Sequence, residues 1–140
     1  MDSRSIPEIV FDQSIGDIFA LRIAGNIVNK EILASMEYGT KYAGAKLIVI
    51  MGHTQCGAVE AVHKGVRGGS LSPIIDIIRV AQEQKPESSI DNLALRNVDN
   101  MVQRVVEESA VIREMVANKE VVLVGALYDL ESGVVKFSSI

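Results

Sequence analysis

The sequence has no tryptophan, and aromatic residues make up only 4% of its 140 residues. Proteins that hold single-stranded nucleic acid stack bases on aromatic side chains, so this composition weighs against such a platform. Positive charge is also in deficit, because 14 lysines and arginines face 18 acidic residues and the net charge is −4. A negative balance argues against a nucleic-acid surface. We therefore predict no nucleic-acid partner.

Long apolar runs and paired cysteines are missing as well. No run approaches the roughly 20 residues of a membrane span, and no signal-peptide pattern opens the chain, so we predict no membrane partner. A single cysteine, Cys56, excludes an internal disulfide framework and favours a reducing compartment, for which we expect the cytoplasm. What the chain does have is 48% hydrophobic residues, without repeats or linkers. We predict a single domain over residues 1–140.

The most informative stretch starts at Lys46 and reads K-L-I-V-I-M-G-H-T-Q-C-G-A-V-E-A-V. Residues 47–51 form a continuous, β-branched apolar run, which is typical of a strand buried on both faces. A glycine breaks the run, and apolar residues then return at helical spacing. The pattern predicts a strand, a tight turn and a helix, with His53 and Cys56 on the turn. In an open parallel sheet this turn is where ligands bind.

His53 and Cys56 are spaced so that they can hold one soft metal ion. Imidazole nitrogen and thiolate sulfur both suit Zn²⁺, at roughly 2.0 to 2.3 Å. The start of a helix lowers the pKa of a thiol and helps to present a thiolate. Spacing alone is also compatible with a structural pair, in which the cysteine is a buried core residue and the histidine a cap. The strand-turn-helix context favours the metal interpretation.

The remaining pattern predicts an α/β fold with a mostly parallel sheet of about four strands, flanked by helices and joined by right-handed crossovers. Asn29 is predicted to cap a helix that runs to about Tyr42, with Tyr38 among its inward residues. The predicted strands cover 17–23, 47–51, 121–127 and 134–137. The other predicted helices begin at Pro7, after Gly57, at Pro73 and after Ser89, the last one as one broken or two successive helices that end at Asn118.

Several further residues carry weaker signals. Asp2 and Arg4 stand at the extreme N-terminus, where a solvated end is the simplest expectation. His63 follows Cys56 by two helical turns and is interpreted as a surface histidine, with a proton shuttle as the alternative. The glycine-rich segment 65–72 lacks the Lys-Ser/Thr ending and the preceding strand of a phosphate-binding loop.

Three motifs in order resemble the β-class carbonic anhydrases. G-H-T-Q-C-G-A-V is similar to the second zinc motif of that family. The opening M-D-S-R-S-I-P-E-I-V-F-D-Q-S-I-G-D-I-F-A-L-R-I-A-G-N-I-V resembles the first motif, Cys-x-Asp-Ser-Arg, and the segment after it. V-V-L-V-G-A-L-Y-D-L-E-S-G-V-V resembles the last strands. The resemblance runs from Asp2 to about Phe137.

The resemblance implies reversible, zinc-dependent hydration of carbon dioxide to bicarbonate, in which zinc lowers the pKa of a bound water toward about 7. It implies His53 and Cys56 as metal ligands, and Asp2 as a further ligand or as the group that orients the nucleophile. Arg4 would hold Asp2, and the backbone N–H of Gly57 would bind a bicarbonate oxygen. The family also implies a homodimer or a higher homo-oligomer.

One departure from the family pattern is important. The family's first zinc-ligand cysteine would stand immediately before Met1, and the family's further central strand lies upstream of that cysteine. Either the sequence is a fragment or a mis-started reading of a longer protein, or another chain fills the place of that strand; we favour the fragment and expect impaired zinc binding. Arg22 matches a family arginine near a regulatory bicarbonate site, but the following Ile23 replaces an asparagine, so Arg22 is interpreted as structural.

Two other classes of function stay open. One is a zinc-free homologue that acts as a binding or regulatory subunit, which the missing cysteine favours. The other is a thiol enzyme in which Cys56 is the nucleophile and His53 the base. Metal analysis separates the first alternative from the enzyme, and pH-dependent alkylation of Cys56 tests the second.

Overall fold

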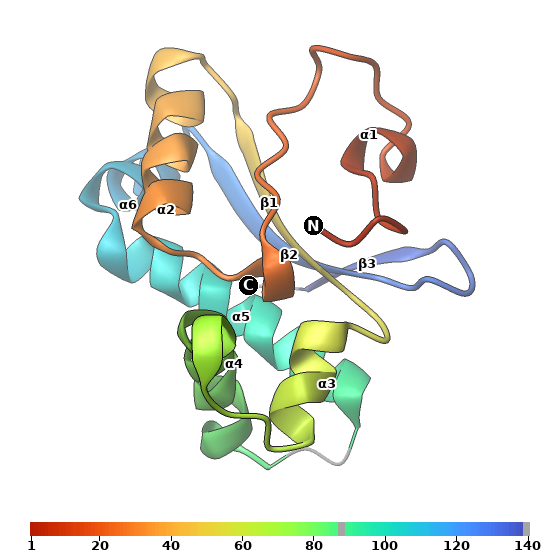
Figure 1. The fold of residues 1–140 in the computed structure, drawn as a ribbon. Coiled ribbons are helices and arrows are strands. Elements are labelled where there is room, and N and C mark those ends of the chain that lie inside the picture. The colour runs from red at the N-terminus through yellow and green to blue at the C-terminus, as the bar shows by residue number, and fades with distance from the viewer. Residues whose placement is uncertain (87–88, 139–140) are drawn as a thin grey trace.

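The computed structural model describes residues 1–86 and 89–138. A three-stranded sheet is flanked by helices, and Figure 1 shows α5 crossing below β1 and β2. The strands are β1 (Leu47–His53), β2 (Val122–Tyr128) and β3 (Val135–Ser138). The α-helices are α1 (Pro7–Val10), α2 (Lys30–Glu37), α3 (Gly57–His63), α4 (Ser72–Gln84), α5 (Ile90–Glu108) and α6 (Ala110–Ala117). Shorter helical turns are η1 (Ala24–Asn26), η2 (Tyr38–Tyr42) and η3 (Gly69–Leu71).

The sheet is mixed. β1 pairs with β2 in parallel, with Leu47 opposite Val122 and His53 opposite Tyr128. β2 then pairs with β3 antiparallel, because a short turn can join only antiparallel strands. The parallel pair places the ends of β1 and β2 at the same edge of the sheet, so the turn that follows His53 lies beside the turn that follows Tyr128.

Local signals explain most element starts. Side chains of Asn29, Ser89 and Ser109 accept hydrogen bonds from backbone N–H groups in the first turns of α2, α5 and α6. Pro7 and Pro73 stand in the first turns of α1 and α4, where a missing N–H costs nothing. The predicted helices are confirmed, and the helical region 89–118 is two helices rather than one.

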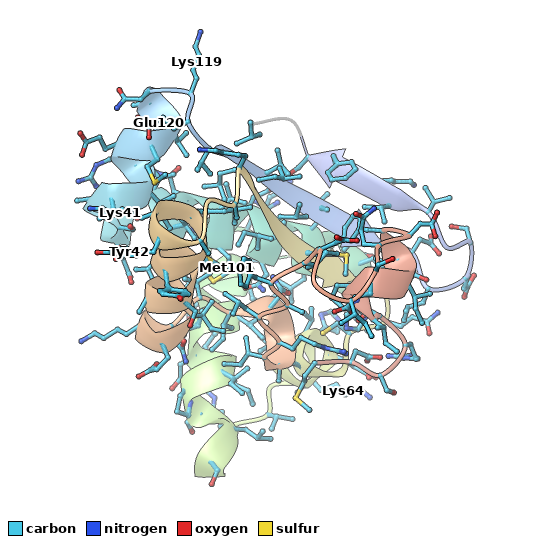
Figure 2. The ribbon with its side chains drawn as sticks, turned by 90° about the horizontal axis from the view of Figure 1, so that it is seen from above. Lys41, Tyr42, Lys64, Met101, Lys119 and Glu120 are labelled. Atoms are coloured by element: carbon cyan, nitrogen blue, oxygen red, sulfur yellow. The ribbon has the colours of Figure 1, made fainter. Side chains whose placement is uncertain are left out.

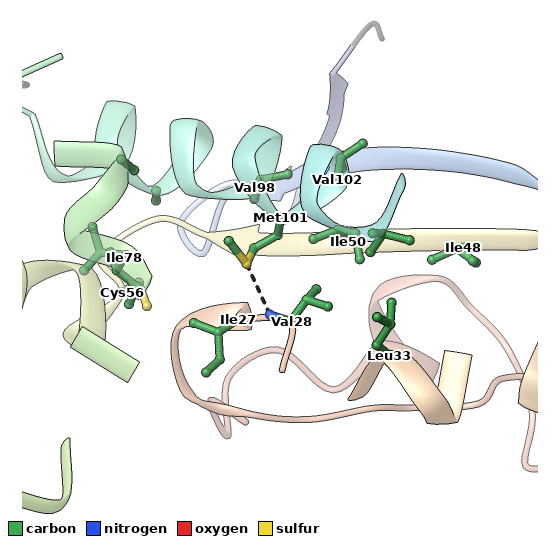
Figure 3. Packing of buried hydrophobic residues seen from close by; sticks show 14 of the residues in the cluster. Ile27, Val28, Leu33, Ile48, Ile50, Cys56, Ile78, Val98, Met101 and Val102 are labelled. Carbon is green, nitrogen blue, oxygen red and sulfur yellow. Dashed lines mark hydrogen bonds between the residues drawn. The ribbon is translucent and has the colours of Figure 1, made fainter. Parts of the chain in front are cut away.

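The core lies between the sheet and the helices α3, α4 and α5. Figure 3 shows Val98, Met101 and Val102 of α5 close to Ile50 of β1, and all four residues are buried. The sulfur of Met101 accepts a hydrogen bond from the backbone N–H of Val28 at 3.2 Å (Figure 3). This contact ties the segment before α2 to α5. Figure 2 shows Met101 within the body and Lys119 extending away from it.

Residues 17–23 do not form the strand predicted for them. The segment is non-helical and makes no ladder in the described structure, and Phe19 is 61% exposed. It lines a groove of about 980 Å³ together with residues 47–51 of β1, so it borders the sheet without pairing to it. The sheet therefore has three strands, not the expected four.

Tyr38 was predicted to point inward, and this is wrong. In a helix of about 3.6 residues per turn, Tyr38 lies nearly opposite Met36, so regular helical spacing already turns its side chain outward. The α-helix ends at Glu37, and the chain continues as the π-helical turn η2. Tyr38 is 63% exposed and stacks on Tyr42 with ring centroids 6.0 Å apart. No helix of the described residues is long and apolar enough to cross a membrane.

Candidate metal centre

The candidate site lies on the turn between β1 and α3. The strand brings His53 to the sheet edge, and Cys56 stands one residue before Gly57, at the start of α3. Gly52 permits close packing here, because a Cβ at this position would approach Cγ2 of Val98 to 2.8 Å. The predicted strand-turn-helix is confirmed, and α5 supports it from beneath.

The ring of His53 has a defined orientation. Its Nδ1 lies 2.8 Å from the carbonyl oxygen of Thr54, and since a carbonyl can only accept, Nδ1 carries the proton in this bond. The other nitrogen, Nε2, is then free to bind a metal or accept a hydrogen bond. Fixing one ring nitrogen on a backbone carbonyl is the usual way to orient a metal-binding histidine.

Cys56 is only 5% exposed and lies within hydrogen-bonding reach of His53. Burial by itself would raise the pKa of the Cys56 thiol. The hydrogen bond to His53 and the backbone N–H groups of Val59 and Ala58 outweigh it, so the pKa is lowered from its usual value of 9.0. The same hydrogen bond raises the pKa of His53 above 6.5, although burial opposes this. In the metal-free chain, the two shifts together favour a thiolate beside a protonated imidazolium.

Asp2 is held beside this pair by Arg4. The guanidinium of Arg4 donates from Nε to Oδ1 of Asp2 at 2.8 Å and from Nη2 to Oδ2 at 2.7 Å, and the backbone N–H of Arg4 also donates to Oδ1. These bonds hold the pKa of the Asp2 carboxyl well below its usual range. Oδ2 of Asp2 lies 3.7 Å from Nε2 of His53. The N-terminal residues are therefore ordered against the site.

Arg22 has a role that the sequence interpretation missed. Its Nη2 donates to the backbone carbonyl of Asp2 at 2.6 Å, and the hydroxyl of Ser5 donates to the same oxygen at 3.3 Å. Arg22 is thus structural, as predicted, but what it supports is the site. The sequence gives no sign of this contact, because Arg22 and Asp2 meet only when the 17–23 segment folds back toward the N-terminus.

The site opens into the groove of about 980 Å³ described above. Met1, Asp2, His53, Cys56 and Gly57 all line it. Gly57 is exposed, and no atom lies within 4 Å of the position that a Cβ would take. His63 is not part of this arrangement: it is exposed and lines a different, shallower hollow with Glu60 and Asp91.

Imidazole, thiolate and carboxylate are all donors that Zn²⁺ accepts. His53 and Cys56 meet and offer two of them, while the carboxylate of Asp2 is turned to Arg4. Among residues 1–86 and 89–138, no three His, Cys, Asp or Glu side chains are arranged to hold a metal ion. The donor chemistry therefore fits zinc, and the pair supplies half of a tetrahedral set.

A family model described as carbonic anhydrase matches residues 1–135. The chain belongs to the carbonic anhydrase family. Two curated relatives agree. Carbonic anhydrase 2 of Mycobacterium tuberculosis is 34% identical over 140 residues, which cover 94% of this chain and 68% of that protein. A carbonic anhydrase of Mycolicibacterium smegmatis is 31% identical over 146 residues, which cover 99% of this chain and 71% of that protein.

Solved structures give the same result for the fold. A tetrameric β-carbonic anhydrase of Sordaria macrospora superposes with a TM-score of 0.88 at 24% identity, over 99% of this chain and 77% of that chain. A β-carbonic anhydrase of Aspergillus fumigatus superposes with a TM-score of 0.86 at 27% identity, over 99% of this chain and 71% of that chain. The expected carbonic anhydrase family and α/β fold class are confirmed.

Proposed function

We propose that this carbonic anhydrase catalyses the reversible hydration of carbon dioxide to bicarbonate, with Zn²⁺ held by His53 and Cys56. The observation that carries the proposal is the meeting of these two side chains at the end of β1, with the carboxylate of Asp2 3.7 Å from His53. Zinc, when bound, supplies a hydroxide nucleophile at neutral pH. A further donor completes the metal site, because catalytic zinc uses three protein ligands and one open position.

The chain's own residues orient the reaction. Thr54 fixes the ring of His53 so that Nε2 faces the metal position. Asp2 stays ionised because Arg4 binds both its oxygens, so it would be able to accept a hydrogen bond from the nucleophile that bound zinc would supply, and thereby to orient it. The backbone N–H of Gly57, at the first position of α3, binds an oxygen of bicarbonate as charge develops on it.

We also propose a homo-oligomer. The outer edge of β1 has no strand partner among the described residues, and an apolar strand edge is a template for pairing. Exposed apolar side chains, Phe19 and Leu21 among them, line the groove beside this edge. The β-carbonic anhydrase of Sordaria macrospora, whose fold this chain shares, is itself a tetramer.

The test compares His53→Ala and Cys56→Ser with the matched control His63→Ala, all made in the chain extended by an upstream apolar strand and a cysteine before Met1, which supplies the further donor. We expect both site variants to lose zinc and carbon dioxide hydration together, since removing a ligand from a zinc site weakens binding by orders of magnitude. His63→Ala keeps its zinc content, because His63 is exposed and lies outside the site. Retention of stoichiometric zinc by Cys56→Ser would contradict the proposal.

A second candidate function rests on the hydrogen bond between His53 and Cys56. An imidazole that lowers the pKa of a thiol is also the arrangement of a cysteine nucleophile and its base. Metal-free protein that turns over a carbonyl or ester substrate, and loses this activity on alkylation of Cys56, would favour the thiol enzyme over the zinc enzyme.

A further inference from the structure

Three parts of the molecule that are distant in sequence meet at Gln55. Its backbone N–H donates to Oδ1 of Asp91 at 3.0 Å, and its side-chain amide donates to Oε1 of Glu131 at 2.9 Å. Its carbonyl oxygen lies 3.5 Å from Nη2 of Arg4. Asp91 belongs to the first turn of α5, and Glu131 to the turn between β2 and β3. Hydrogen bonds from Gln55 to α5 and to the β2–β3 turn therefore hold this residue in place.

These hydrogen bonds offset the cost of an unfavourable backbone conformation at Gln55. Its φ is +53°, a left-handed conformation that a residue with a Cβ adopts only when its surroundings enforce it. Gln55 stands between His53 and Cys56, so its backbone angles set how far apart the imidazole and the sulfur lie. A turn that relaxed at Gln55 would separate the two side chains.

The hairpin turn is built to reach this position. The carboxylate of Asp129 accepts from the backbone N–H groups of Glu131 at 2.9 Å and Ser132 at 3.0 Å, which folds the turn. Beside the Glu131 contact, the N–H of Leu130 donates to the hydroxyl of Thr54 at 3.0 Å. The N–H of Thr54 in turn donates to the carbonyl of Tyr128 at 3.0 Å. Three hydrogen bonds thus join the hairpin to Thr54 and Gln55.

We propose that Glu131 and Asp91 are positioning residues of the zinc site, which clamp Gln55 and so fix the spacing of His53 and Cys56. Neither carboxylate touches the two candidate ligands; both act through Gln55. The effect of this clamp on zinc binding and catalysis rests on the function proposed above. The clamp itself is a property of the folded chain and can be measured without metal.

The variants exploit the direction of the Gln55–Glu131 hydrogen bond. Glu131→Ala removes the acceptor, whereas Glu131→Gln keeps an acceptor oxygen at the same place. Gln55→Glu sets two carboxylates against each other. The double variant Gln55→Glu/Glu131→Gln restores the bond with donor and acceptor exchanged. A merely structural role of the turn does not predict this rescue.

The first readout is amide hydrogen exchange of the metal-free protein over residues 52–58, with α6 as the internal control. We expect exchange of this segment to rise about three- to tenfold in Glu131→Ala and Gln55→Glu, since a hydrogen bond to a charged acceptor is lost. It should stay near the unsubstituted rate in Glu131→Gln and in the double variant. Equal exchange in all four variants would overturn the clamp.

The second readout is the visible absorption spectrum of the protein with Co²⁺ in place of zinc, which reports ligand geometry without turnover. We expect Glu131→Ala and Gln55→Glu to bind Co²⁺ about 10- to 100-fold more weakly, as for outer residues that orient metal ligands, and the double variant to recover. Unchanged affinity in both single variants would overturn the positioning role. The Co²⁺ series is made in the chain extended by an upstream apolar strand and a cysteine before Met1, because His53 and Cys56 alone are too few ligands to retain a metal. If this extended chain without substitutions bound no Co²⁺, the proposed function would fail, and the exchange result alone would decide the clamp.

Discussion

Oδ2 of Asp2 lies 3.7 Å from Nε2 of His53, which brings the start of the chain against the end of β1. Two arginines hold Asp2 in this position. Arg4 binds the carboxylate and Arg22 binds the backbone carbonyl of the same residue. A terminus that would otherwise be solvated is therefore part of the site, and its contribution can be tested apart from the ligands.

Replacing Arg4 with glutamine should raise the pKa of Asp2. The pKa of Asp2 is depressed chiefly by the hydrogen bonds from Arg4, so Asp2 is ionised well below 3.8 in the unsubstituted protein and becomes protonated only as pH falls through the depressed value. In Arg4→Gln the carboxyl should titrate nearer 3.8. Carbon NMR of the labelled carboxyl measures this.

In the chain extended by an upstream apolar strand and a cysteine before Met1, the same variant should hydrate carbon dioxide about 10- to 100-fold more slowly with zinc content unchanged, because Arg4 orients Asp2 without binding metal. Lys64→Gln is the matched control, since Lys64 pairs with Glu60 away from the site. An Asp2 titration that did not move in Arg4→Gln would show that another group keeps the carboxylate ionised.

His53→Ala should raise the pKa of Cys56. Burial, which raises this pKa, remains in the variant, whereas the hydrogen bond that lowers it is lost. In metal-free protein the thiolate, followed by its ultraviolet absorbance, should form below pH 9.0 in the unsubstituted chain and at higher pH in the variant. Thiolate formation at the same pH in both proteins would contradict the hydrogen bond between the two side chains.

The two shifts also predict how the stability of the metal-free protein depends on pH. The raised pKa of His53 contributes stability that is complete below 6.5 and is lost as pH rises through the folded value. The lowered pKa of Cys56 contributes stability above 9.0 that is lost as pH falls through the folded value. Because the two groups stabilise each other, His53→Ala should flatten the profile between these limits.

Gly52→Ala should destabilise the fold by about 1–3 kcal/mol, the usual cost of overpacking a core. The added Cβ would lie 2.8 Å from Cγ2 of Val98, so α5 must move away from the end of β1. Gly57→Ala is the matched control, because open space surrounds its Cβ position. Chemical denaturation measures both variants. Equal free energies of unfolding would contradict the close packing at Gly52.

Self-association should depend on the groove beside β1. We expect the protein to scatter light as a dimer or larger assembly at micromolar concentration, and Leu21→Lys to shift it toward monomer, because Leu21 is an exposed apolar residue of the groove. Leu71→Lys, at an exposed leucine of η3 outside the groove, should leave the assembly unchanged. A monomeric unsubstituted chain that unfolds cooperatively would contradict this expectation.

The sequence predicted the parts of the fold that local chemistry determines. The apolar run before His53 predicts β1, and the cap at Asn29 predicts the start of α2. The segment 17–23 misled because its apolar residues favour an extended backbone without identifying a partner strand, and this segment borders a groove instead. Tyr38 was assigned to the wrong helix face, because at about 3.6 residues per turn it lies nearly opposite Met36 and points outward.

The parts of the site that lie close together in the sequence were also predictable. His53 and Cys56 stand on one turn, so their meeting follows from the strand-turn-helix pattern. The roles of Asp2 and Arg4 came from family resemblance, and the structure supplies the contacts between them. The supports of the turn, Asp91 and Glu131, are isolated carboxylates in the sequence. Glu131 reaches Gln55 because the parallel pairing of β1 and β2 brings their following turns to one edge, and Asp91 reaches it because α5 packs against β1.

The most direct test of the account is zinc content and carbon dioxide hydration, measured by stopped flow on the same sample. The 140-residue chain is compared with the same chain extended by an upstream apolar strand and a cysteine immediately before Met1. Met1 lines the groove with His53 and Cys56, so a cysteine placed before it can reach the metal position. A matched extension that ends in serine controls for the added strand.

We predict low zinc occupancy and little or no hydration from the 140-residue chain, because His53 and Cys56 are too few to retain zinc. The cysteine extension should gain both, and the serine extension should gain neither. Full zinc occupancy with rapid turnover from the 140-residue chain would contradict the need for a further ligand. A zinc-saturated cysteine extension without turnover would contradict the proposed function itself.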